Sequence, residues 1–151
     1  MLITGYGGED EMPKNFSGGC ACGAVRYECN ADPIAAGHCQ CRACQRDSGT
    51  GHGSHIMLPK AASTVTGDVK FYDSPADSGN IVSRGFCPTC GTSVLSHNSG
   101  MPDMMAVRAA SLDDPSLFEP MLVVFTESAQ PWDTLDEDLP SFPKMPDMMP
   151  G

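Results

Sequence analysis

Short apolar or alternating runs recur along the chain, and Gly, Pro, Asp or Ser residues separate them. Their lengths and intervals are typical of strands in an antiparallel sheet protein. The runs are residues 24–29, 54–58, 68–73, 81–86, 92–97, 104–111 and 120–128. Helical character is confined to the turn around residues 42–47 and to residues 112–118. The pattern therefore predicts an all-β fold of antiparallel sheets with few short helices.

The run at residues 24–29 shows the alternation most clearly. Val25, Tyr27 and Cys29 share one face of the predicted strand, while Arg26 and Glu28 share the other. Cys29 is therefore predicted to be a small core residue, because it continues the apolar face.

The length of 151 residues is typical of one domain with a hydrophobic core of its own. We expect the domain to span residues 16–143. Residues 1–15 and the Pro- and Met-rich residues 144–151 are predicted to be terminal tails.

The net charge changes the range of possible partners. It is -10, from 9 Lys and Arg against 19 Asp and Glu. Such a surface repels phosphate backbones and anionic lipid headgroups, so neither nucleic acid nor membrane is an expected partner. No apolar run approaches the roughly 20 residues of a transmembrane helix. The N-terminal residues are acidic and do not resemble a signal peptide, so we expect a cytoplasmic protein.

Eight cysteines supply the candidate chemistry. In a reducing compartment, clustered cysteines indicate a metal site more often than disulfides, and neighbours two positions apart do not readily bridge each other. Seven of the eight fall in three clusters: Cys20 and Cys22; Cys39, Cys41 and Cys44; Cys87 and Cys90. The last cluster forms a Cys-Pro-x-Cys-Gly turn, which is typical of a zinc knuckle.

Seven thiols divide naturally into four and three. A structural zinc takes four protein ligands, while a catalytic zinc takes three and keeps one position open. The favoured division joins the two terminal pairs into one closed site and leaves the central three as an open one, with two Zn²⁺ per chain. Spacing leaves two alternatives open. In the first alternative, Cys39 and Cys41 share a metal with the knuckle cysteines, Cys87 and Cys90, and Cys44 is left free. In the second, His38, His52 or His55 completes the central three.

Three thiolates on Zn²⁺ leave a formal charge of -1, which suits a soft fourth ligand such as a substrate thiol held as thiolate. Arg42 and Arg46 lie four apart in the predicted helical turn, on one face, where they would grip the carboxylates of an anionic thiol. The alternative is that both arginines offset the negative zinc site. Asp47 and His52 are the nearest candidates for a general base.

The sequence resembles the glutathione-dependent formaldehyde-activating enzymes, a family that includes the centromere protein V relatives. The resemblance rests on "GGCACGAVRY", "CQCRACQRDSG" and "FCPTCGTSV", with "ASLDD" and "LPSFP" further on, and covers roughly residues 17–143. One departure is Gln40, at a position where family members commonly carry His.

The resemblance implies an all-β, Mss4-like fold with two zinc sites. Cys20, Cys22, Cys87 and Cys90 match the structural ligands, and Cys39, Cys41 and Cys44 match the catalytic ones. The implied activity is that of a carbon–sulfur lyase, which interconverts formaldehyde plus glutathione with S-hydroxymethylglutathione. A related thiol or aldehyde is equally compatible with the motifs. The competing interpretation is a zinc-stapled binding module without catalysis.

Overall fold

The computed structural model describes residues 15–146, which form ten strands, one α-helix and four 3₁₀ turns. The strands are β1 (Phe16–Gly19), β2 (Arg26–Cys29), β3 (Ala35–Cys39), β4 (Gly53–Pro59), β5 (Ser63–Thr66), β6 (Lys70–Pro75), β7 (Ile81–Phe86), β8 (Ser93–Asn98), β9 (Met104–Arg108) and β10 (Leu122–Val124). The helix is α2 (Arg42–Ser48). Of the predicted tails, 1–15 and 144–151, residues 1–14 and 147–151 lie outside the described residues.

All seven predicted runs contain a strand, and three further strands escaped the sequence analysis. These are β1, β3 and β5, with the sequences FSGG, AAGHC and STVT. They are rich in Gly, Ala, Ser and Thr, so they have little apolar alternation to mark them. These three segments are strands because they pair with neighbouring strands, and their own sequences do not indicate it.

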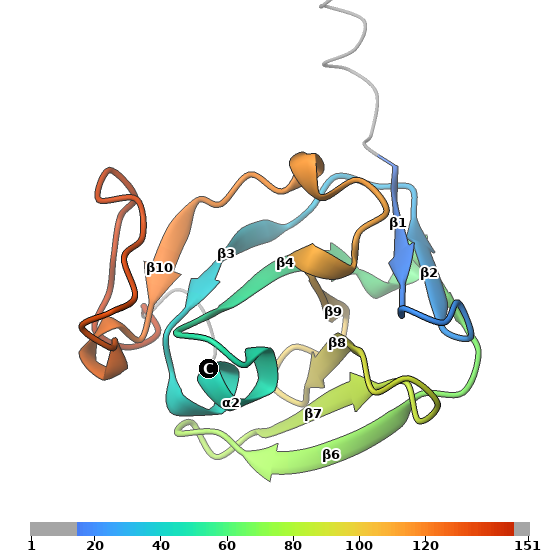
Figure 1. Ribbon diagram of the computed structural model, residues 1–151, viewed down its shortest axis with the longest axis horizontal. Helices are drawn as coiled ribbons and strands as arrows, with labels where there is room; N and C mark the ends of the chain where they lie inside the picture. The colour runs from blue at the N-terminus through green and yellow to red at the C-terminus, as the bar shows by residue number, and fades with distance from the viewer. Residues whose placement is uncertain (1–14, 147–151) are drawn as a thin grey trace, which may run out of the picture.

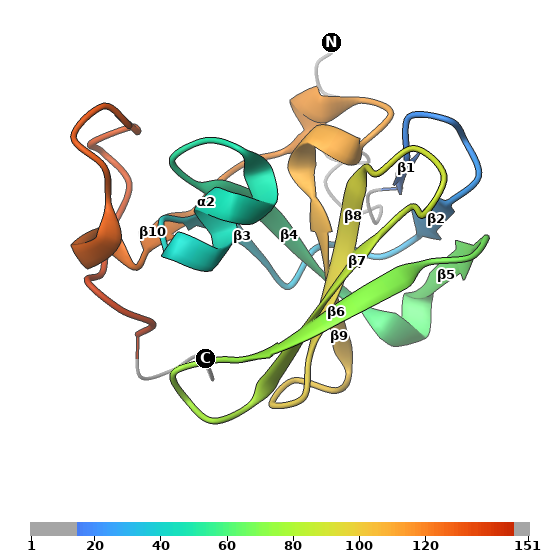
Figure 2. The ribbon, with the colours of Figure 1, turned by 60° about the horizontal axis from the view of Figure 1, so that its bottom comes forward.

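The strands form two sheets, a three-stranded one in the order β1-β2-β5 and a seven-stranded one in the order β10-β3-β4-β9-β8-β7-β6. Every pairing is antiparallel except β10 with β3, which is parallel. The larger sheet curls, and α2 lies on its concave side (Figures 1 and 2). The fold is therefore mostly β with one short helix, as predicted.

The core is built from residues of both sheets. Its largest fully buried side chains include Tyr27, Phe16, Ile56, Leu58 and Leu95. Cys29 is 1% exposed and belongs to this core, which confirms the prediction from strand alternation. On β4 the alternation has a second consequence: Ile56 and Leu58 enter the core, so His55 and Met57 face the opposite side.

The helix α2 begins and ends with clear capping signals. The Cys41 sulfur accepts a hydrogen bond from the Cys44 amide (3.3 Å) as the N-cap, and Gly49 ends the helix with a left-handed φ of 80°. The second predicted helical stretch contains only a 3₁₀ turn, Pro115–Leu117. Among residues 15–146, no helix is long and apolar enough to cross a membrane.

Candidate metal centres and cavity

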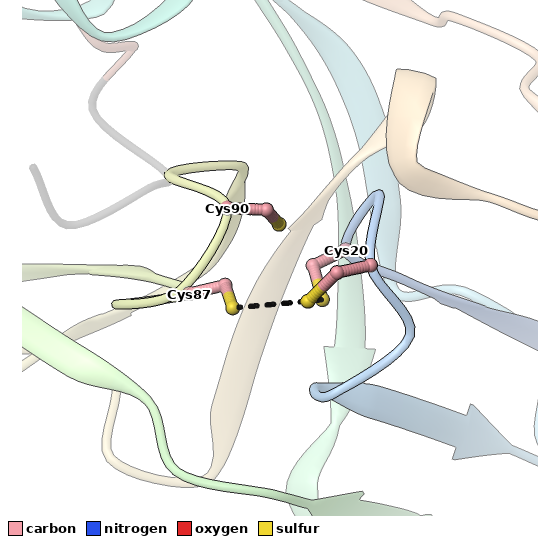
Figure 3. Close-up of side chains that lie close together, drawn as sticks. Cys20, Cys87 and Cys90 are labelled. Atoms are coloured by element: carbon pink, nitrogen blue, oxygen red, sulfur yellow. Dashed lines mark hydrogen bonds between the residues drawn. The ribbon is translucent and has the colours of Figure 1, made fainter.

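The first sulfur cluster joins two turns that are far apart in the sequence. Cys20 and Cys22 lie in the turn between β1 and β2, and Cys87 and Cys90 lie in the turn between β7 and β8. All four sulfurs lie within 4.8 Å of one another. Figure 3 shows Cys87 and Cys90 facing Cys20 across the gap between the turns. This arrangement has the ligand number and type of a closed structural zinc site.

Hydrogen bonds orient the sulfurs of this four-cysteine cluster. The amide of Val25 donates to Cys20 Sγ (3.2 Å), and the amide of Thr89 donates to Cys87 Sγ (3.4 Å). The Thr92 hydroxyl accepts from the Ala21 amide (3.1 Å) and donates to Cys90 Sγ (3.2 Å).

The hydrogen bond from Thr92 lowers the pKa of Cys90 to about 5, so this thiol is already predisposed to the thiolate form that a metal requires.

The second cluster lies where β3 leads into α2. Cys39 ends β3, Cys41 caps the helix and Cys44 lies in its first turn. Their three sulfurs also lie within 4.8 Å of one another. The structure thus groups the seven thiols as four and three, and the alternative in which Cys39 and Cys41 pair with the knuckle is wrong.

Three thiols this close cannot all ionise without a cation between them. The pKa of Cys41 is lowered, chiefly by hydrogen bonds from Cys39 and Cys44, while the pKa of Cys39 is raised by the same contacts. One of the three thiols is therefore favoured as the thiolate, and ionisation of the others is disfavoured. A divalent cation with affinity for thiolates offsets the repulsion between the three negative charges. The three sulfurs therefore fit a zinc ion with three protein ligands.

The imidazole of His55 contacts the three-cysteine cluster. Its Nε2 lies 3.5 Å from Cys44 Sγ, and its Nδ1 lies 3.4 Å from Arg108 Nη1. Arginine can only donate, so Nδ1 is the acceptor and the ring proton is on Nε2. Burial, reinforced by the charge of Arg108, lowers the pKa of His55 to about 3, which leaves the ring neutral. His55 therefore offers an N–H to Cys44 rather than a lone pair to a metal.

The other two candidate histidines are engaged elsewhere. His38 Nδ1 bonds to Ser54 Oγ (2.8 Å), and His52 Nδ1 lies 3.0 Å from both carboxylate oxygens of Asp133. Gln40 also donates to Asp133 (3.0 Å), so the residue that departs from the family pattern ties the cysteine loop to the C-terminal segment. No histidine joins the metal-ligand groups found among residues 15–146.

Asp47 forms a buried ion pair rather than projecting into open space. It accepts from Arg108 Nε (2.8 Å) and from Ser93 Oγ (3.0 Å), and both charged side chains are nearly buried. The pair anchors α2 to β8 and β9. Neither Asp47 nor His52, the two residues suggested as general bases, lines the cavity described next.

A cavity of about 780 Å³ opens on the concave side of the large sheet. All three cysteines of the second cluster line it, together with His55, whereas none of the first four cysteines does. Its cationic lining residues are Arg42, Arg84, Arg108 and Lys144, and its acidic ones are Asp77 and Glu127.

The structure separates the two arginines proposed to bind substrate. Arg42 lines the cavity, although it also donates to Gln45 Oε1, whereas Arg46 is exposed and lies outside the lining. The sequence analysis missed Arg84 and Arg108. Both lie on strands, and from the sequence alone an arginine that faces a cavity cannot be told from one that faces solvent.

Comparisons with known proteins agree with this geometry. The family described as Glutathione-dependent formaldehyde-activating enzyme matches residues 15–128. A crystal structure of a Rhodobacter sphaeroides protein from structural genomics has a TM-score of 0.54 at 24% identity, over 69% of this chain and 96% of that chain. At that identity the likeness supports the fold alone. A search of curated proteins finds no match.

Proposed function

The chain belongs to the glutathione-dependent formaldehyde-activating enzyme family, and from that premise we propose that it is a zinc-dependent carbon–sulfur lyase. Its substrates would be thiol–aldehyde adducts, formed from glutathione and formaldehyde or from a related pair. Antiparallel sheets with two cysteine clusters fit the Mss4-like fold of this family. The proposal includes a reducing cytoplasmic location, where clustered thiols persist.

One observation carries the proposal. The cluster with three sulfurs lines the cavity, while the cluster with four sulfurs does not. Structural sites are closed by four protein ligands, whereas catalytic sites keep a position for substrate. The incomplete donor set therefore lies where a small molecule can reach it.

Cys39, Cys41 and Cys44 would hold the catalytic zinc, and the four-cysteine cluster would hold the structural one. When bound at the three sulfurs, zinc supplies a coordination position that favours a substrate thiol in its nucleophilic thiolate form. In the reaction, sulfur bonds to the carbonyl carbon, the C=O π bond breaks, and the oxygen takes a proton. The reverse direction breaks the carbon–sulfur bond and releases the aldehyde.

His55 is the residue best placed to donate a hydrogen bond to that oxygen as negative charge develops on it. It holds a hydrogen on Nε2, which lies 3.5 Å from Cys44 Sγ, and it lines the same cavity. Arg108 fixes the tautomer from the other side of the ring. Arg42 lies at the cavity wall, where its charge attracts an anionic thiol.

The test compares Cys44→Ser with Cys90→Ser, and Cys29→Ala serves as the control because Cys29 belongs to neither cluster. Wild type and control should hold two zinc ions by elemental analysis. Cys90→Ser should melt far lower, because metal binding at structural sites contributes on the order of 10 kcal/mol to folding in zinc peptides. Cys44→Ser should stay folded with one zinc and lose thiol-dependent turnover.

Full turnover by a Cys44→Ser protein that lacks its second zinc would refute the lyase proposal. If Cys44→Ser unfolds as readily as Cys90→Ser, the three-cysteine cluster is structural. The non-catalytic binding module then becomes the better explanation.

A further inference from the structure

The floor of the cavity holds two arginines around one serine. Arg84 on β7 lies directly opposite Ser96 on β8 in the antiparallel register, and Arg108 Nη1 donates to Ser96 Oγ (3.3 Å). All three residues line the cavity. Two guanidinium groups therefore flank the same position on the concave face of the sheet.

Both arginines have hydrogen-bonding capacity left over. Arg108 is 7% exposed, and its Nη2 is buried without a hydrogen-bond partner among the described residues. Arg84 donates to Ser74 Oγ (3.2 Å), and no carboxylate within residues 15–146 forms an ion pair with it. An unpaired buried donor is costly, so such a group usually has a hydrogen-bond partner, which a bound ligand can supply.

The charge of this region contrasts with the rest of the protein. Four cationic and two acidic side chains line the cavity, in a chain whose net charge is -10. Two of the four cations form ion pairs, Lys144 with Glu127 (4.0 Å) and Arg108 with Asp47 (2.8 Å), and Arg84 forms none among the described residues. The cavity thus concentrates positive potential where the remaining surface repels anions.

This positive floor lies close to the three-cysteine cluster. A single imidazole, that of His55, stands between Arg108 and Cys44. A ligand whose sulfur lies at the cluster would therefore need only a short chain to reach the guanidinium groups. Guanidinium forks match planar carboxylates in shape and charge.

We infer that Arg84 and Arg108 form a carboxylate subsite, and that the preferred thiol is a small mercapto acid with its carboxylate a few bonds from sulfur. The inference rests on the proposed function, because it takes the three-cysteine cluster as the sulfur site. It makes Arg84 and Arg108 residues that determine substrate specificity, beyond Arg42 at the cavity wall.

The test measures the preference for acid over amide in protein loaded with Co²⁺, whose absorption changes when a thiol binds. Wild type should bind 3-mercaptopropionate ten- to a hundred-fold more tightly than 3-mercaptopropionamide, roughly the value of hydrogen bonds to a charged group. Arg84→Gln should reduce this ratio to near one and leave amide affinity unchanged. Arg46→Gln, outside the cavity, should keep the full ratio.

Arg84 is the position to change, because removing Arg108 would leave Asp47 without its buried partner. Equal affinities for acid and amide in wild type would overturn the inference. So would an unchanged ratio in Arg84→Gln, or an equal loss of both affinities, which would show that Arg84 acts on the metal instead.

A second measurement separates this inference from the proposed function. The thioether 3-(methylthio)propionate has the acid group but no thiol, and calorimetry should detect its binding to wild type and not to Arg84→Gln. If no thiol perturbs the metal spectrum while this difference persists, the subsite stands and the lyase proposal falls. If the thioether acid binds no better than its amide and the thiols show no acid preference, the subsite is wrong.

Discussion

Removing the Asp47 carboxylate should destabilise the protein severely. Asp47→Ala leaves the Arg108 guanidinium, whose side chain is 8% exposed, without its ion-pair partner. Only neutral contacts remain: Nε donates to Ser93 Oγ (3.1 Å), the two contacts of Nη1 are long at 3.3 and 3.4 Å, and Nη2 has no partner among the described residues. Breaking a buried pair from one side costs about 3–5 kcal/mol, a large share of the roughly 5–15 kcal/mol of a typical domain.

Urea unfolding of the zinc-loaded protein measures this loss. Asp47→Asn keeps an oxygen that accepts from Ser93 and Arg108, so it should lose less than Asp47→Ala. The double variant Asp47→Ala with Arg108→Met should recover part of the stability, because neither charge remains buried alone. A loss below about 1 kcal/mol in Asp47→Ala, or additive single effects, would refute the reasoning.

The same variants decide between two roles for Asp47. A general base would lose turnover in Asp47→Asn while the free energy of unfolding stayed the same. The structure predicts instead that the free energy of unfolding falls, because Asp47 lies in an ion pair outside the cavity lining.

Two further predictions concern the core and the cavity. Burial raises the pKa of Tyr27 to about 12 from 10.0, so its stabilisation is complete below pH 10 and is lost as pH rises to 12. The wild-type free energy of unfolding should fall by up to about 3 kcal/mol more than that of Tyr27→Phe across this window, and parallel curves from alkaline urea titrations would contradict the assignment. In Gly53→Ala, the new methyl group would lie 2.7 Å from His55 Nε2 and 3.3 Å from Cys44 Cβ. Both zinc ions should remain while turnover drops on the order of a hundred-fold, as for a displaced catalytic group, and unchanged kinetics would exclude a role for His55.

The sequence alone predicts the strands in which apolar and polar residues alternate. β2 was recognisable because Tyr27 and Cys29 alternate with Arg26 and Glu28. β3 was not, because its residues Ala35–Cys39 are small or polar and it becomes a strand by pairing with β4 and β10. The parallel pairing with β10 in particular depends on a long connection that local pattern does not encode.

The candidate site also has a part that the sequence predicts and a part that it does not. Ligand chemistry and spacing favoured the grouping of the seven thiols that the structure shows, because zinc takes three or four ligands, but the alternative with Cys39 and Cys41 at the knuckle is excluded only by the fold. The positions of His55, Arg84 and Arg108 depend on strand register instead. Arg84 meets Ser96 only because β7 and β8 pair with a particular offset, and a one-residue slip would turn it to the other face.

The cavity wall has two origins along the chain. The sulfurs and the sheet floor come from the region that matches the family, residues 15–128, whereas Lys144, Met145 and Pro146 come from beyond it. These three residues contact neither cysteine cluster through any hydrogen bond found among the described residues. The part of the cavity wall formed by Lys144, Met145 and Pro146 can consequently be altered without changing the cysteine clusters. Substitutions there could be used to admit bulkier or differently charged thiols in the proposed reaction.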